Sequence, residues 1–144
     1  MKIKIKNIIE ENLQMWQKEY DNSLTGRITY QLLPRINITY KNKNWHTNYF
    51  ITQCLCGHGN FGQYLERFKI TDCRECHLCG SGVEDDVLHT LLKCDFFMKL
   101  RTEMGIKGNS LSDLAPTKNN SAIKIFLDYL HRVMKMKPEY NSSD

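Results

Sequence analysis

The chain has 144 residues, of which 41% are hydrophobic and 25% are charged, and its formal net charge is +4. This composition is typical of a globular protein, and the length suits one hydrophobic core. A wholly disordered chain is excluded, and so is a membrane-spanning helix, because no run of about 18 apolar residues occurs. We expect one domain over residues 1–138 and a disordered tail over residues 139–144.

The first residues lack the features of a targeting segment. Met1 to Gln14 include three lysines, but Glu10 and Glu11 interrupt the apolar run that a secretory signal needs. Acidic residues are also rare in transit peptides. The sequence therefore predicts an intracellular protein without a membrane partner, in a compartment where thiols stay reduced.

Helices are expected over most of the chain. Near the N-terminus apolar residues recur at steps of three or four and form one stripe, Ile5, Ile9, Leu13, Trp16 and Tyr20. Further helices are expected over residues 45–56, 60–68 and 86–104. A last stripe stops before Pro138 and consists of Ile123, Phe126, Leu127, Leu130 and Met134. The predicted fold is a small, mainly α domain in which each helix needs the others to bury its stripe.

Residues 24–40 are the exception to the helical pattern. Gly26 and Pro34 interrupt this stretch, and Ile36, Ile38 and Tyr40 alternate with polar residues. A period of two is that of a β-strand with one buried face. We expect one short β segment near residues 28–40.

Six cysteines are more than an ordinary intracellular domain needs. They form either three disulfides in a secreted protein or thiolate ligands of a metal ion in an intracellular one, and the lack of a signal segment favours the metal. Four residues follow the spacing C-x2-C-x9-H-x4-C, namely Cys76, Cys79, His89 and Cys94. Three cysteines and one histidine are the composition of closed structural zinc sites. The sequence predicts an irregular zinc-binding loop, a zinc knuckle, at residues 73–94.

The spacing of the last two ligands constrains the local structure. His89 and Cys94 are five residues apart, which is roughly 140° around an ideal α-helix. An unbroken helix therefore cannot present both side chains to one ion. We expect the helix that carries His89 to stop or distort near Lys93, and a new helix to begin at Asp95.

Alternatives stay open around this motif. Cys73 and Cys76 also form a C-x2-C pair, so Cys73, or the neighbouring His77, could replace a ligand. Asp85 and Asp86 look like the metal-binding carboxylates of a polymerase, but their place at a helix start favours acidic caps.

A resemblance to a known family is carried by four stretches, "SLTGRITYQLLPRI", "QCLCGHGNFGQYLERF", "CHLCG" and "EDDVLHTLLKC". In this order they resemble the segment after the reverse transcriptase in arthropod non-long-terminal-repeat retrotransposons, of the type-1 ribosomal-gene and jockey-like kinds. The resemblance runs from Trp16 to Arg101. The chain departs from the family pattern at Cys56, where threonine is usual, and at Asp95, where proline often follows the last cysteine.

The resemblance implies that the chain is the C-terminal part of a reverse transcriptase polyprotein, with the same four residues as zinc ligands. No stretch matches the polymerase fingers and palm, the endonuclease or the acidic cluster of a ribonuclease H, so we expect no enzyme activity. A zinc hydrolase that uses His58 as its base is disfavoured as well, because four protein ligands leave no position for water. The location would be the nucleus if the chain follows its parent element.

The expected partner is a nucleic acid, either RNA or DNA. Residues 1–50 carry eight Lys/Arg against four Asp/Glu. The candidates for phosphate contact are Lys2, Lys4, Lys6, Arg27, Arg35, Lys41 and Lys43, and those for base stacking are Tyr30, Tyr40 and Trp45. An equally weighted interpretation is a solvated basic face. Residues 51–100, with five Lys/Arg against seven Asp/Glu, favour a protein-interaction module that docks on the polymerase or another chain.

Overall fold

The computed structural model describes residues 1–140 and is mainly helical, which confirms the predicted fold class. The α-helices within these residues are α1 (Lys2–Asn22), α2 (Arg27–Leu32), α3 (Tyr49–Cys56), α4 (Gly62–Arg67), α5 (Met98–Met104) and α6 (Asn120–Met136). Shorter helical turns are η1 (Ile36–Ile38), η2 (His89–Lys93), η3 (Asp95–Phe97) and η4 (Leu111–Leu114). None of the helices in residues 1–140 is long and apolar enough to span a membrane.

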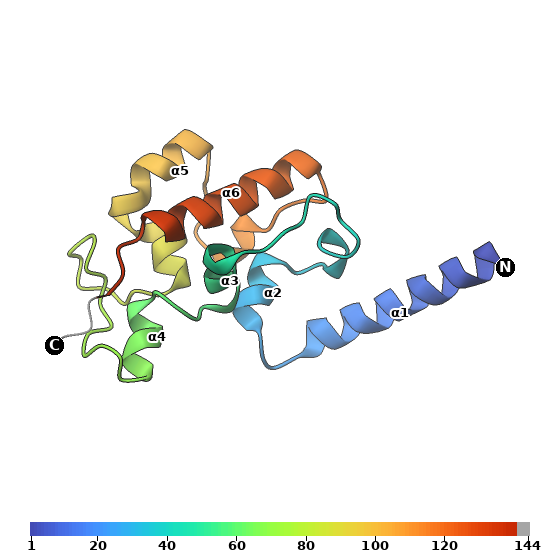
Figure 1. The fold of residues 1–144 in the computed structure, drawn as a ribbon, viewed down its shortest axis with the longest axis horizontal. Helices are drawn as coiled ribbons and strands as arrows, with labels where there is room; N and C mark the ends of the chain where they lie inside the picture. Colours follow the sequence, from blue (N-terminus) through green and yellow to red (C-terminus); the bar gives the residue numbers. More distant parts are fainter. Residues whose placement is uncertain (141–144) are drawn as a thin grey trace.

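Helix α6 forms the centre of the core and packs across α3 (Figure 1). Its predicted apolar stripe is confirmed, because all five of the stripe residues are buried. From α3, Ile51 and Cys54 face it with no exposed surface. Burying one large aliphatic or aromatic side chain contributes about 1.5–3 kcal/mol, so this contact is a main source of stability. α2 lies beside α3 and η4 and closes the core on another side.

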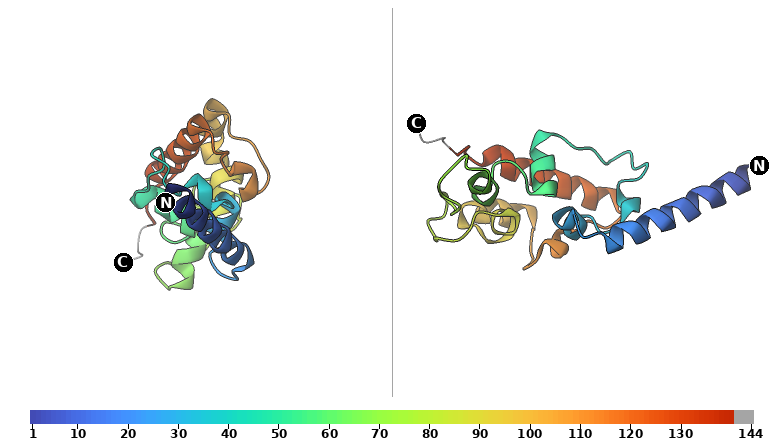
Figure 2. Two further views of the ribbon diagram at one scale, coloured as in Figure 1. Left: turned by 90° about the vertical axis from the view of Figure 1, so that its right-hand side faces the viewer. Right: turned by 90° about the horizontal axis from the view of Figure 1, so that it is seen from below.

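Helix α1 projects away from this core along most of its length (Figures 1 and 2). It has no buried residue; Ile5 is 52% exposed and Trp16 is 49% exposed. Only its last turns are attached, where Tyr20 Oη donates to Leu33 O at 3.0 Å and Gln17 Nε2 donates to Pro34 O at 2.8 Å. The expectation that every helix buries its stripe against the others is therefore wrong for α1.

The predicted β segment near residues 28–40 is also wrong. This stretch forms α2 and the single 3₁₀ turn η1, separated by Pro34. Ile36 and Ile38 are both buried, but in different places: Ile38 belongs to the core, and Ile36 lies against the end of α1, where its backbone N donates to Gln17 Oε1. Within residues 1–140 the β pairing is limited to one isolated bridge between Glu75 and Glu84, so residues 28–40 have no partner strand.

The chain beyond α6 packs back on the body up to Tyr140. Tyr140 Oη donates to Asp85 Oδ2 at 2.6 Å, and Asn60 Nδ2 donates to Pro138 O at 3.0 Å. Of the tail expected over residues 139–144, Tyr140 thus has defined contacts. Residues 141–144 lie outside the described part of the chain.

Candidate metal centre

Four side chains from separate turns of the chain meet at one point. The sulfur atoms of Cys76, Cys79 and Cys94 and a ring nitrogen of His89 all lie within 4.8 Å of one another. Cys76, His89 and Cys94 are buried, and Cys79 is half-buried. These are the four residues that the C-x2-C-x9-H-x4-C spacing predicted, and the fold brings them together in a group of three cysteines and one histidine suited to hold a metal ion.

Two distances within this group can be compared with those of a tetrahedral zinc site. Two Zn–S bonds of about 2.3 Å at a tetrahedral angle separate their sulfurs by about 3.8 Å, and a Zn–N bond of about 2.0 Å gives an S–N separation of about 3.5 Å. Cys76 Sγ lies 3.8 Å from Cys94 Sγ, and Cys79 Sγ lies 3.4 Å from His89 Nε2. Two of the six separations thus equal those of a tetrahedral shell, and the other four are no longer than 4.8 Å.

The helix break expected near Lys93 is present, and it takes the form of a π-helix. Residues 89–93 follow a short α-turn and widen into a π turn that Cys94 N closes by donating to His89 O at 2.7 Å. In a π turn the hydrogen bond spans five residues, so His89 and Cys94 come onto the same side of the chain. Cys94 is extended, and a new 3₁₀ turn begins at Asp95, as predicted. From α6, Tyr129 Oη donates to Leu91 O and fixes the distorted turn.

The other two ligand positions come from a short hairpin-like loop. Cys76 N donates to Val83 O at 2.9 Å, and Asp85 N donates to Arg74 O at 2.9 Å. Gly80 follows Cys79 with φ of +62°, a left-handed conformation that favours glycine and turns the chain back. The loop thus carries Cys76 and Cys79 to one side of the site, opposite η2.

The ligand side chains differ in how readily they reach the protonation state that binds a metal. Burial lowers the pKa of the His89 imidazole against the opposing effect of Asp85 and Asp86, so His89 is neutral and free to coordinate at neutral pH. Burial opposes ionisation of Cys79, but hydrogen bonds with Ser81 outweigh it and hold the pKa of this thiol below its ordinary value; Ser81 Oγ lies 2.9 Å from Cys79 Sγ. Burial raises the pKa of the Cys94 thiol to about 12. A bound cation would have to displace that proton, which couples metal affinity to pH.

A buried ion pair ties the loop to the C-terminal segment. Asp85 has no exposed surface, and both of its carboxylate oxygens accept from Lys137 Nζ at 2.7 Å. Thr90, Gly62 and Tyr140 donate further hydrogen bonds to the same carboxylate. Burial raises the pKa of Asp85, but the Lys137 ammonium and these hydrogen bonds outweigh it and hold the pKa below its ordinary value.

The two predicted acidic caps therefore have different roles. Asp86 is a cap, because its Oδ1 accepts from His89 N at 2.7 Å. Asp85 is not a cap; that expectation is wrong, since the carboxylate is directed inward to Lys137. Little in the sequence indicated this pair, because its members are separated by most of the C-terminal half of the chain and Lys137 follows a helix end, where a solvated lysine is usual.

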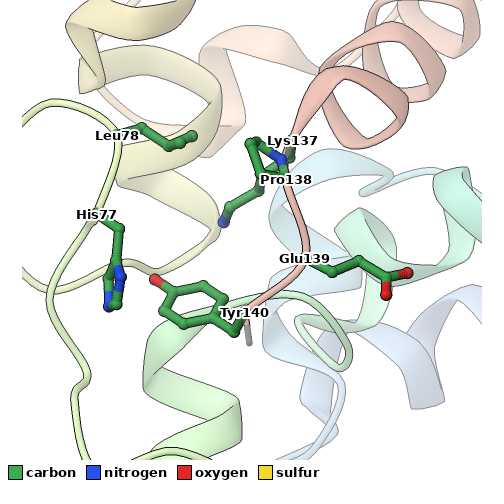
Figure 3. Close-up of a pocket in the computed structure, with 6 residues that line it drawn as sticks. All are labelled: His77, Leu78, Lys137, Pro138, Glu139 and Tyr140. Atoms are coloured by element: carbon green, nitrogen blue, oxygen red, sulfur yellow. The ribbon is translucent and has the colours of Figure 1, made fainter. Parts of the chain in front are cut away.

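The spare candidates of the motif lie outside the four-residue group. Within residues 1–140, the group that could hold a metal does not include Cys73 or His77. Cys73 is half-buried. The His77 ring contacts the Tyr140 ring edge-on at a centroid distance of 4.5 Å, and both line a hollow of about 230 Å³ beside the C-terminal segment (Figure 3). His77 is thus engaged with the C-terminal segment.

The candidate nucleic-acid contacts divide into three groups. Lys2, Lys4 and Lys6 are exposed on the first turns of α1. Arg27, Arg35, Tyr30 and Trp45 lie near the attachment of α1 or against the core. The Arg27 guanidinium lies 4.0 Å from the Tyr30 ring centre and donates to Tyr20 O, so this arginine caps the end of α1. Tyr30 Oη donates to Asp21, and Trp45 packs on the core.

The third group forms a basic depression of about 380 Å³. It is lined by Asn37, Tyr40, Lys41, Asn42, Lys43 and Asn44 together with Lys118 and Asn120. Three of these side chains are lysines and none is acidic. Lys118 was not among the predicted contacts, because it lies far along the chain from Lys41. The sequence did contain one sign that Lys118 is unusual. It directly precedes Asn119, the N-cap of α6, and the positive end of the helix dipole disfavours a lysine at this place.

Fold and site together define a small helical domain with a knuckle of three cysteines and one histidine. Comparison with known proteins finds similarity to segments of retrotransposon polyproteins. The chain is 31% identical over 103 residues, 70% of its length, to the "Putative 115 kDa protein in type-1 retrotransposable element R1DM" of Drosophila melanogaster. It is 30% identical over 98 residues, 67% of its length, to a "Retrovirus-related Pol polyprotein from type-1 retrotransposable element R1 4" of Nasonia vitripennis.

The chain is therefore related to part of the polyproteins of type-1 retrotransposable elements, which confirms the resemblance drawn from its motifs. A third relative is a "Retrovirus-related Pol polyprotein from type-1 retrotransposable element R1" of Bradysia coprophila, 29% identical over 65% of the chain. The matched segments cover 10%, 24% and 9% of these three relatives, so the chain spans a small part of each. No family model and no solved structure matches the chain.

Proposed function

We propose that the chain is a non-catalytic, zinc-stabilised nucleic-acid-binding module from the C-terminal part of a retrotransposon reverse transcriptase polyprotein. The observation that carries the zinc assignment is the convergence of Cys76, Cys79, His89 and Cys94, whose ligand atoms lie within 4.8 Å of one another and include an S–S and an S–N separation of tetrahedral length. Four protein ligands leave no coordination position for water or substrate, so the metal has a structural role. Zinc would join the loop of Cys76 and Cys79 to the π turn and hold both against α6.

Nucleic-acid binding is supported by the basic depression. Phosphate groups are attracted by clustered lysines, and Tyr40 adds a ring on which a base can stack. Lys41 Nζ lies 5.3 Å from the Tyr40 ring centre, which orders both side chains. Lys41 has φ of +51°, a conformation that costs energy for a residue with a side chain, and strained residues of this kind cluster at functional sites. The N-terminus of α6 opens into the same depression and adds positive potential.

A second function, docking on another protein, is favoured by α1. Its exposed face carries Ile5, Ile8, Met15 and Trp16, each about half exposed, and the body covers only the last turns of the helix. In a longer polyprotein, the polymerase or another chain would cover this face. The two functions differ in their salt dependence, because phosphate contact weakens steeply with salt and apolar docking does not.

The expected result for nucleic acid is weak, salt-dependent binding through the depression. For single strands the slope of log K against log salt is about −0.7 for each neutralised phosphate. The triple variant Lys41→Glu, Lys43→Glu, Lys118→Glu should therefore flatten the slope by about 2 if each lysine contacts one phosphate. Fluorescence anisotropy of labelled single-stranded RNA and DNA, titrated at several salt concentrations, measures both the affinity and the slope.

A matched control separates this site from overall charge. Lys99→Glu, Lys107→Glu, Lys135→Glu changes the net charge by the same amount at exposed positions on α5, after α5 and at the other end of α6. The control should keep most of the slope. If both triple variants lose the same amount of affinity and slope, binding depends on overall charge, which would contradict a site at the depression. Binding that does not change with salt would favour protein docking.

A further inference from the structure

The turn between α3 and α4 borders a hollow that the basic depression does not include. The hollow has a volume of about 320 Å³ and lies between α2, this turn, α4 and the loop that carries Cys76. Its lining includes Ile28, His58, Tyr64, Glu66, Arg67 and Arg74. Pockets that hold small ligands begin at about 300 Å³, so the hollow is large enough for one nucleotide-sized group.

The turn is built to hold His58 at the rim of this hollow. Gly57 and Gly59 have φ of +70° and +126°. A Cβ on Gly57 would lie 2.5 Å from Ile28 Cδ1, and one on Gly59 would collide with the Gln53 side chain. Both positions therefore require glycine. The consequence is that an exposed His58 stacks its ring on Tyr64, with a centroid distance of 4.8 Å and planes 25° apart.

The lining of the hollow also includes two arginines, Arg67 and Arg74. Arg67 is exposed and, among residues 1–140, has no carboxylate partner within ion-pair distance. Arg74 forms an ion pair with Glu84, and Glu66 lies near Lys69. Arginine binds phosphate through its planar fork of donors, and a flat histidine–tyrosine pair offers a face to a base. A purely apolar ligand would leave the Arg67 guanidinium without a partner, and a simple anion would make no use of the aromatic pair.

We infer that this hollow binds one unpaired nucleotide of a single-stranded nucleic acid. The base stacks on the His58–Tyr64 pair, and the phosphate contacts Arg67 and Arg74. This inference rests on the proposed nucleic-acid-binding function and adds a second contact surface to it. The knuckle loop positions one side of the hollow, because the backbone of Arg74 pairs with that of Asp85.

The test combines a mononucleotide with an oligonucleotide on the full chain. AMP added to isotope-labelled protein should shift the NMR signals of His58, Tyr64 and Arg67, whereas inorganic phosphate alone should leave the two rings unshifted. The double variant His58→Ala, Tyr64→Leu should weaken binding of a single-stranded oligoadenylate by about five- to a hundredfold, the range that stacking of one base provides. Arg67→Gln, at an exposed position, should also weaken it without affecting folding.

The matched control is His46→Ala, Tyr49→Leu, an exposed histidine and tyrosine away from the hollow. This control should bind the oligoadenylate like the unmodified chain. If the oligoadenylate binds in a salt-dependent way and the His58 and Tyr64 variant binds equally well, the hollow is not the nucleotide site, while the proposed function stands. If the oligoadenylate does not bind at all, the proposed function fails, and the inference about the nucleic acid fails with it.

Discussion

Replacing Cys79 with serine is expected to abolish stoichiometric zinc binding and cooperative unfolding. Binding of zinc to a Cys/His site of this kind releases about 10–16 kcal/mol at neutral pH, and the whole stability of a domain is about 5–15 kcal/mol. Loss of one ligand therefore removes a large part of what holds the loop and η2 together. Serine at Cys76 or Cys94 and alanine at His89 should have the same effect, but Cys79 is the cleanest position because it is only half-buried.

The control for this prediction is Cys73→Ser. Cys73 is half-buried like Cys79 and receives the same substitution, but it lies outside the four-residue group. The variant should keep one zinc per chain and change the melting temperature little. Zinc per chain is measured by elemental analysis, and unfolding by circular dichroism. Loss of zinc in Cys73→Ser together with its retention in Cys79→Ser would mean that Cys73 and Cys76 are the binding pair.

Replacing Lys137 with methionine should destabilise the chain by about 3–5 kcal/mol, because the Asp85 carboxylate would then remain buried without its cation. The Lys137 side chain is 2% exposed and that of Asp85 is 0% exposed, so water cannot replace the lost partner. The free energy of unfolding is measured by urea titration. Asp85→Ala should cost a comparable amount, since it leaves the Lys137 ammonium buried near the Phe61 ring.

An exposed ion pair on α6 provides the control. Asp128 and Arg132 lie 3.0 Å apart and are about half exposed, so Asp128→Ala should cost no more than about 1 kcal/mol. The double variant Asp85→Ala, Lys137→Met should recover much of the loss, because both buried charges are then removed. If Lys137→Met lowers the free energy of unfolding no more than Asp128→Ala does, Lys137 does not compensate the buried charge of Asp85.

The sequence predicted the grouping of Cys76, Cys79, His89 and Cys94 more completely than the rest of the fold. Ligand spacing is local chemistry, and the five-residue step from His89 to Cys94 required a break in the helix. What it could not predict was the form of the break. The π turn depends on a contact from Tyr129, on a helix that begins well downstream.

The errors came from patterns that have two structural solutions. Ile36 and Ile38 alternate with polar residues as in a strand, yet a single 3₁₀ turn buries both side chains. The stripe on α1 is helical as predicted, but periodicity does not reveal whether another element is present to cover it. The ion pair of Asp85 and Lys137 could not be predicted from the sequence. The two residues lie far apart along the chain, and only the folded structure shows that they meet.

We propose that Cys76, Cys79, His89 and Cys94 hold one zinc ion in a closed tetrahedral shell. X-ray absorption spectroscopy of the zinc-loaded chain tests it most directly, because the spectrum counts sulfur and nitrogen neighbours of the metal. We expect three sulfurs at about 2.3 Å and one nitrogen at about 2.0 Å, with no water in the shell. A shell of four sulfurs, or one that contains oxygen, would contradict it.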